Sequence, residues 1–174
     1  MGTMAFPFFG LLGYEWMKDY VVTFDYKNQV LTLEKSPKLG KPLLSVPFSQ
    51  ERHIPIITLT IQQKNYPLGI DCGANANVIY QPYASVVSPL LQEVMTEKVN
   101  GAEGSEQQSI TGYLPEANIG SLVFKDMFMA MTENKINVDA SKQLPIQGLL
   151  GTPFLQLYKT VIDFPQKTIA FYQH

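Results

Sequence analysis

The stretch that decides the fold is residues 68 to 80, which read Leu68-Gly69-Ile70-Asp71-Cys72-Gly73-Ala74-Asn75-Ala76-Asn77-Val78-Ile79-Tyr80. An acidic residue ends an apolar run, a small residue and a glycine follow it, and a second apolar run comes next. Aspartate is uncommon inside strands, and glycine adopts backbone angles that other residues avoid. The stretch therefore predicts a strand, a sharp turn and a second strand, with the Asp71 carboxylate at the turn.

Two interpretations of Asp71 are open at this point. A carboxylate held by rigid backbone, accepting hydrogen bonds from the N–H groups of the following turn, suits a group that points at a substrate with a tuned pKa. The alternative is an ordinary Asx-type turn, in which Asp71 only caps its own backbone. The local sequence allows both, so other parts of the chain have to separate them.

Length and composition limit the possible classes of protein. A chain of 174 residues is long enough for one domain with a sizeable core. The formal net charge is −2 without a long run of either sign, which argues against a nucleic-acid or membrane-surface role built on charge. We expect no membrane span, because no apolar run is long enough. We also expect no signal peptide, because residues 1–9 lack its basic segment. Short β-branched and aromatic runs between prolines and glycines predict an all-β domain.

Cysteine and histidine usage bears on metals and on nucleophilic chemistry. Cys72 is the single cysteine, which excludes an internal disulfide and a cysteine-based metal cluster. Acidic residues are scattered and no histidine pair has ligand spacing, so we expect neither a metal nor a cofactor. A further hypothesis makes Cys72 a nucleophile paired with His53. Nothing in their spacing brings the imidazole near the thiol, and a small residue beside a turn is the simpler interpretation.

The pattern along the rest of the chain predicts mainly strands. Residues 20–33 predict a β-hairpin that follows a helical turn. Further strands are expected at residues 54–61, 110–114, 117–120 and 123–131, with Met127, Met129 and Met131 as core residues. Apolar spacing across residues 82–98, interrupted by Pro89, predicts one broken helix or two short ones. Residues 100–105 are glycine-rich and predict a flexible tip between strands.

The chain also contains an internal repeat. Gly148-Leu149-Leu150-Gly151 matches Gly10-Leu11-Leu12-Gly13, and the match continues without a gap at a constant spacing of 138 residues. The other matches are Phe154-Leu155 with Trp16-Met17, Tyr158 with Tyr20, Asp163-Phe164 with Asp25-Tyr26, and Ile169 and Phe171 with Leu31 and Leu33. A spacing of domain length indicates duplication of a whole lobe. Asp25 and Asp163 each precede a tight turn, so we interpret both as turn residues and not as catalytic carboxylates.

The order of these parts resembles one lobe of a retropepsin-like aspartic peptidase, of the bacterial two-lobe type. Asp71-Cys72-Gly73-Ala74 is similar to the active-site loop of that family, and residues 99–113 are similar to its flap. Residues 146–151 resemble the apolar-apolar-Gly loop through which the family threads its active-site strand. Residues 54–172 look like one complete lobe, and residues 8–33 look like the last quarter of a preceding one.

This resemblance implies a fold and a division into domains. The expected fold class is all-β, a closed β-barrel lobe with one or two short helices and a flap hairpin. Residues 1–34 would be the C-terminal remnant of a preceding lobe, with a hairpin that packs on the main lobe. Residues 35–50 would be a linker, and residues 51–174 the retropepsin-like lobe.

The resemblance also implies a reaction. In this family two carboxylates face each other across a water molecule and share one proton, because like charges so close cannot both ionise at neutral pH. Asp71 would supply one carboxylate, and its partner would come from a missing first lobe or from the second subunit of a homodimer. The implied substrate is an extended peptide or unfolded protein, gripped through its main chain. The flap tip, Gly101, Ala102, Glu103 and Gly104, would close over it.

One position departs from the family pattern. The family has Thr or Ser where this chain has Cys72, and that hydroxyl bonds to the opposing loop, whereas a thiol is a weaker donor and acceptor. Together with the single Asp-loop, this favours an alternative function, a catalytically inactive peptidase-fold module that binds extended peptides or has a structural role. The resemblance further suggests an extracytoplasmic location, periplasmic or secreted.

Overall fold

The computed structural model describes residues 12–51, 53–100, 106–132 and 146–174. Its helical segments are short, namely α1 (Tyr14–Met17), α2 (Ala84–Val87), the 3-10 helix η1 (Ser88–Leu90) and α3 (Thr152–Leu155). Its strands are β1 (Val21–Asp25), β2 (Val30–Glu34), β3 (Leu44–Pro47), β4 (Ser49–Glu51), β5 (Ile54–Ile61), β6 (Lys64–Ile70), β7 (Asn77–Tyr80), β8 (Gln92–Asn100), β9 (Glu106–Ile119), β10 (Leu122–Thr132), β11 (Gly148–Leu150), β12 (Lys159–Asp163) and β13 (Thr168–Tyr172). The expected all-β class is confirmed.

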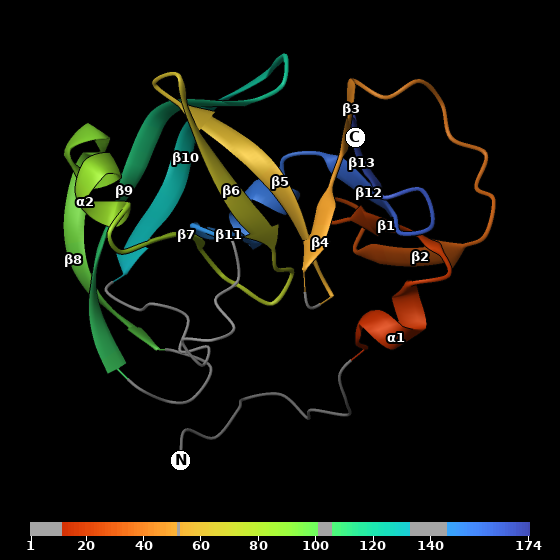
Figure 1. The fold of residues 1–174 in the computed structure, drawn as a ribbon, viewed down its shortest axis with the longest axis horizontal. Coiled ribbons are helices and arrows are strands. Elements are labelled where there is room, and N and C mark those ends of the chain that lie inside the picture. Colours follow the sequence, from red (N-terminus) through yellow and green to blue (C-terminus); the bar gives the residue numbers. More distant parts are fainter. Residues whose placement is uncertain (1–11, 52, 101–105, 133–145) are drawn as a thin grey trace.

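The strands form two sheets that lie side by side (Figure 1). One sheet has the order β4-β5-β6-β11-β7-β10-β9-β8, and the other has the order β2-β1-β12-β13-β3. In the larger sheet β5 also pairs with β9, where Thr60 lies opposite Asn118, so the strands from β5 to β9 close into a barrel. The expectation of a closed barrel is therefore confirmed.

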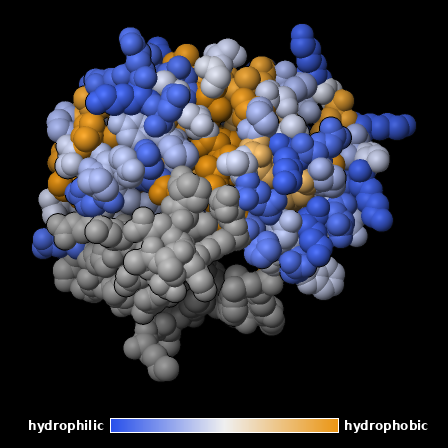
Figure 2. Space-filling model, in the orientation of Figure 1, coloured by the Kyte–Doolittle hydropathy of each residue, from blue (hydrophilic) through white to orange (hydrophobic). Residues whose placement is uncertain are grey.

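A single large core joins the barrel to the smaller sheet. Its fully buried members come from both sheets and include Leu59, Leu68, Ile79, Leu114, Met129, Leu150, Phe154, Ile169 and Phe171. Met127, Met129 and Met131 are all buried, as predicted from their apolar character. On the surface, hydrophilic residues dominate the side that carries the loop between β2 and β3, and apolar residues gather near the middle of the view over β5 (Figure 2).

The connection between β6 and β7 crosses the end of another strand, and this crossing places the Asp71 loop. Strand β11 lies between β6 and β7, parallel to β6 and antiparallel to β7. The chain therefore leaves β6 at Ile70, passes over the end of β11, and returns as β7, two strands away. Residues 71–76 form this crossing loop, which contains the Asp-small-Gly-Ala sequence.

The helical prediction for residues 82–98 is only partly right. Helix α2 and the 3-10 helix η1 occupy the first half, and the helical part ends just after Pro89. From Gln92 onward the chain is strand β8, so the predicted helix there is wrong. The apolar side chains of Val94 and Met95 that suggested it are 54% and 48% exposed. Pairing with the long strand β9 satisfies the backbone of β8, and this tertiary interaction overrides the local spacing.

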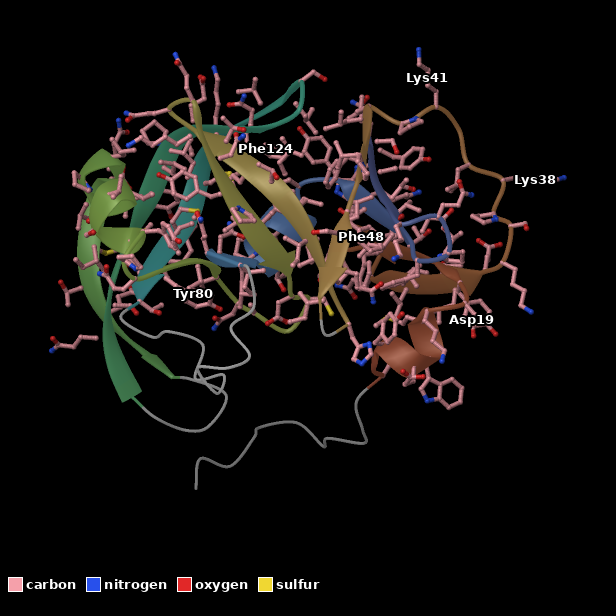
Figure 3. The ribbon with its side chains drawn as sticks, in the orientation of Figure 1. Asp19, Lys38, Lys41, Phe48, Tyr80 and Phe124 are labelled. Atoms are coloured by element: carbon pink, nitrogen blue, oxygen red, sulfur yellow. The ribbon has the colours of Figure 1, made fainter. Side chains whose placement is uncertain are left out.

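The expected linker at residues 35–50 also contains structure that the sequence did not predict. Strand β3 pairs with β13, and Val46 lies opposite Ile169. The first two residues of β4, Ser49 and Gln50, also fall within the expected linker. Leu44 and Val46 are partly buried against the core, an alternation that was too short to recognise next to Pro47. Only the loop before β3 remains a surface connection, and its Lys38 and Lys41 project outward (Figure 3).

The two copies of the internal repeat have the same local structure. Helices α1 and α3 begin and end at matched residues. The turn after β1 is closed by the Asn28 N–H, which donates to Asp25 Oδ1 at 3.1 Å, and in the turn after β12 the Gln166 N–H donates to Asp163 Oδ1 at 2.8 Å. Both aspartates therefore serve as turn residues, as predicted.

The repeats also pair with each other. Strands β1 and β12 run antiparallel, and Thr23 lies opposite Val161, its own counterpart in the repeat. The same register places Val21 opposite Asp163. A residue that faces its counterpart marks the axis of a local two-fold rotation, so each hairpin maps onto the other across the middle of the five-stranded sheet.

Candidate active site

Asp71 follows directly after β6 and is held from two sides. Its backbone N–H donates to the carbonyl of Leu150 on β11 at 3.0 Å. Its Oδ1 accepts from the Gly73 N–H at 2.9 Å, and its backbone carbonyl accepts from the Ala74 N–H at 3.2 Å. The local geometry is thus that of an Asx turn, but the turn is fixed to a barrel strand that is distant in sequence. Asp71 is half-buried.

The segment after β11 supports the rest of the Asp71 loop. The Thr152 N–H donates to the carbonyl of Ala74 at 2.8 Å, and the Thr152 hydroxyl donates to the carbonyl of Cys72 at 3.4 Å. A Cβ atom on Gly151 would overlap the carbonyl oxygens of Ala74 and Ala76, so only glycine allows this approach. The two loops that resemble the family motifs therefore lie in direct contact.

Asn77 is a structural residue of this site that the sequence analysis did not identify. Its side chain is buried, with Oδ1 accepting from the Gly151 N–H at 2.9 Å and Nδ2 donating to the Phe128 carbonyl at 2.9 Å. It ties β7, β10 and the end of β11 together. The available signal was one amide residue at the start of an apolar strand, which is a position where a buried polar group needs partners.

Two titratable side chains near Asp71, those of Tyr80 and Cys72, have pKa values raised in the direction of the uncharged form. Burial, with a smaller contribution from the Asp71 carboxylate, raises the pKa of the Tyr80 hydroxyl well above its usual value. Desolvation by neighbouring atoms, followed by the Asp71 charge, raises the pKa of the Cys72 thiol. A raised thiol pKa opposes the hypothesis that Cys72 is a nucleophile paired with His53. The ring of His53 instead stacks on the ring of Tyr14, with centroids 4.4 Å apart. Tyr80 lies on β7 (Figure 3).

The first repeat reaches the site through Tyr26. Burial raises the pKa of the Tyr26 hydroxyl, while a hydrogen bond with the Thr152 side chain lowers it in part. Beside it is an open pocket of roughly 380 Å³, lined mainly by apolar residues of the β1–β2 hairpin and by the Asp71 loop, namely Phe24, Asp25, Tyr26, Gln29, Val30, Leu31 and Cys72. The β1–β2 hairpin of the first repeat thus lies against the Asp71 loop, which is also hydrogen-bonded to Thr152 of the second repeat.

The predicted flap is described only in its two arms. Strands β8 and β9 pair as an antiparallel hairpin up to Asn100 opposite Glu106. The predicted substrate-contacting residues Gly101, Ala102, Glu103 and Gly104 lie outside the described residues. In the part of the chain that is described, no three His, Cys, Asp or Glu side chains are grouped as a metal site would require. The described helices are also too short to cross a membrane.

A closed barrel in which an Asp-loop crosses the end of an inserted strand is the architecture of a retropepsin-like aspartic peptidase lobe. Comparison with solved structures supports this class. The crystal structure of a retropepsin-like aspartic protease from Rickettsia conorii matches with a TM-score of 0.55 and 16% identity, covering 74% of this chain and 90% of that chain. At this identity the likeness concerns the fold.

Sequence comparison identifies the family. A family model described as aspartyl protease matches residues 57–154, which is more than half of the chain. The chain therefore belongs to the aspartyl protease family. A comparison with curated proteins gave no significant match.

Proposed function

We propose that the protein is an aspartic endopeptidase unit that hydrolyses peptide bonds through a pair of aspartates and an activated water, with Asp71 as one of the pair. The observation that carries this proposal is the fixing of the Asp71 loop to β11 and α3, because an isolated Asx turn would need no such support. Cys72, Gly73 and Ala74 would complete the active-site loop, and the tip of the β8–β9 hairpin would contact the substrate.

The proposed reaction needs a second carboxylate, from a preceding lobe or from another subunit. The charged member of the pair takes a proton from water while the water oxygen attacks the peptide carbonyl carbon. The protonated member donates its proton to the carbonyl oxygen. The tetrahedral intermediate then collapses, the C–N bond breaks, and a proton passes to the leaving amine. Neutral Tyr80 and Cys72 next to Asp71 add no further charge to the pair.

The test uses the polypeptide of the complete reading frame and an unfolded protein substrate at acidic pH. We expect Asp71→Asn to lower the rate of hydrolysis by at least about 100-fold, since it removes a general acid–base group. Asp163→Asn is the matched control, because Asp163 is a turn carboxylate with a similar hydrogen bond. Equal activity of Asp71→Asn and the wild type would disprove the proposal.

A second function is favoured by one observation. Cys72 stands where the family has a hydroxyl residue, and a thiol is a weaker hydrogen-bond donor and acceptor than a hydroxyl, which fits a peptide-binding module without catalysis. Such a module would bind an extended peptide equally well in the wild type and in Asp71→Asn, and neither would cleave it. Peptide binding and cleavage measured on the same two proteins separate the two functions.

A further inference from the structure

A second pocket lies where the barrel meets the end of the second repeat. It is open, has a volume of roughly 440 Å³, and is formed by the start of β10, the segment that joins α3 to β12, the residues that follow β13, and the turn between β1 and β2. Its described lining residues are Lys27, Val123, Phe124, Lys125, Leu157, Tyr158, Gln173 and His174. None of them belongs to the Asp71 loop or to the β8–β9 hairpin. The volume lies in the range of small-ligand sites, about 300 to 1,000 Å³.

The polar part of this pocket is positively charged. Lys27 comes from the turn between β1 and β2, and Lys125 comes from β10, so two ammonium groups reach one pocket from different elements. Among the described residues neither lysine has an ion-pair partner. Glu116 lies opposite Lys125 on β9 and Asp126 follows it, but neither carboxylate lines the pocket. Two cations without an acidic partner in the same pocket favour an anionic ligand.

The carboxylate that His174 approaches is already compensated. His174 Nδ1 lies 3.9 Å from Asp25 Oδ1, and its Nε2 lies 3.0 Å from the Gln156 carbonyl oxygen. Asp25 Oδ2 lies 3.2 Å from Lys159 Nζ, and both Asp25 oxygens accept from the side chain of Asn28. Asp25 is buried and does not line this pocket. Its charge is therefore balanced within the fold and does not offset the two pocket lysines, while the His174 ring is fixed at the pocket edge.

The remaining wall of the pocket is apolar and rigid. The side chains of Val123 and Leu157 are 48% and 45% exposed. The ring of Tyr158 makes T-shaped contacts with the rings of Phe124 and Phe171, at centroid distances of 5.8 Å and 6.1 Å. Both phenylalanines are buried in the main core, which fixes the tyrosine ring. A flat apolar group placed on this wall would remove exposed apolar surface from water.

We propose that this pocket binds a small organic anion with a flat apolar body, of the aryl phosphate type. The anionic group lies between Lys27 and Lys125, and the apolar body packs against Val123 and Leu157. An anion with several acceptor oxygens can bond to both ammonium groups at once, and such charge-assisted hydrogen bonds are about twice as strong as neutral ones. The site uses no part of the Asp71 loop, so this inference stands or fails without the proposed function.

Titration of the 174-residue chain with phenyl phosphate, followed by two-dimensional amide NMR, tests the inference. We expect the amide signals of residues 123–125, 157–158 and 173–174 to shift. In the double variant Lys27→Gln, Lys125→Gln the dissociation constant should rise by at least about tenfold, because both charge-assisted bonds are lost. The same spectra show whether each variant is folded.

The matched control is the double variant Lys38→Gln, Lys41→Gln. Both lysines project outward from the loop before β3 and do not line this pocket (Figure 3), so the control should bind phenyl phosphate like the wild type. It removes the same formal charge from the chain and therefore separates a local site from a general attraction of anions.

Two further ligands separate the two parts of the site. Inorganic phosphate offers the anion alone and benzyl alcohol the apolar body alone, and each should bind more weakly than phenyl phosphate. Val123→Ser should weaken the binding of phenyl phosphate and leave that of inorganic phosphate unchanged. No binding of phenyl phosphate, equal binding by the Lys27→Gln, Lys125→Gln variant and the wild type, or equal affinity for inorganic phosphate and phenyl phosphate would each overturn the inference.

Discussion

The two copies of the repeat share a backbone and differ in their surroundings. Residues 12–34 and 150–172 have the same helix, the same hairpin and the same turn hydrogen bonds. In the second copy the barrel covers Phe154, which is 1% exposed, whereas in the first copy the matching Trp16 is 70% exposed. Local structure is therefore set by the repeated sequence, and burial is set by the presence of a covering unit. Paired substitutions at matched positions measure this difference directly.

The largest contrast is expected between Phe154→Ala and Trp16→Ala in the 174-residue chain. Removing the fully buried ring of Phe154 should lower the free energy of unfolding by about 3 to 5 kcal/mol, from lost burial and a new cavity. The exposed Trp16 should change it by no more than about 0.5 kcal/mol. Urea unfolding of both variants gives the values. If Trp16→Ala lowered the free energy of unfolding as much as Phe154→Ala, the expected difference in burial between the two repeats would be contradicted.

The next contrast uses the matched glycines. A Cβ on Gly151 would meet the carbonyls of Ala74 and Ala76, so Gly151→Ala should cost about 1 to 3 kcal/mol by overpacking. Gly13 has no atom within 4 Å of its ideal Cβ position and lies at φ −93°, so Gly13→Ala should be neutral or stabilise by up to about 1 kcal/mol. Thermal unfolding of both variants checks this, and two similar melting temperatures would contradict it.

The smallest contrast concerns the turn aspartates. Asp25 accepts from the Asn28 side chain and lies 3.2 Å from Lys159 Nζ, whereas for Asp163 the backbone of Gln166 is the donor. We expect Asp25→Asn to lower the free energy of unfolding by about 1 to 2 kcal/mol at neutral pH, and Asp163→Asn by about half as much. Denaturant unfolding at pH 7 gives both values.

The effect of Asp25 should also depend on pH. Hydrogen bonds from Asn28, assisted by Lys159, lower the pKa of Asp25 in the folded protein. Its stabilising contribution is therefore present above the unfolded-state pKa of about 3.9 and is lost as the pH falls through the lower folded value. The difference in stability between wild type and Asp25→Asn should shrink below about pH 4. A difference that is constant from pH 7 to pH 3 would show that the charge of Asp25 does not contribute.

Features with a strong local signal could be predicted from the sequence. The Asp71 turn, the hairpin of residues 20–33 and the core methionines follow from glycine, alternation and apolar character. The fold class followed from the order of the motifs along the chain. The turn roles of Asp25 and Asp163 followed from their place before Asn- and Pro-containing turns.

Features that depend on distant partners could not be predicted. Strand β8 exists because β9 lies beside it, and strand β3 because β13 has an open edge. Asn77 matters because Gly151 and Phe128 come to it from other strands. In each case the deciding hydrogen bond joins residues far apart in sequence, and the local pattern contains no trace of it.

The supports of the Asp71 loop come late in the chain, with Thr152 following Cys72 by 80 residues. During synthesis, which proceeds at about 5 to 20 residues per second, the carboxylate leaves the ribosome several seconds before Leu150 and Thr152 do. A nascent chain therefore carries this aspartate on an unsupported turn, and the turn is fixed only when β11 and α3 have folded against it. The order of synthesis thus separates the making of the Asp71 turn from the making of the residues that hold it in place.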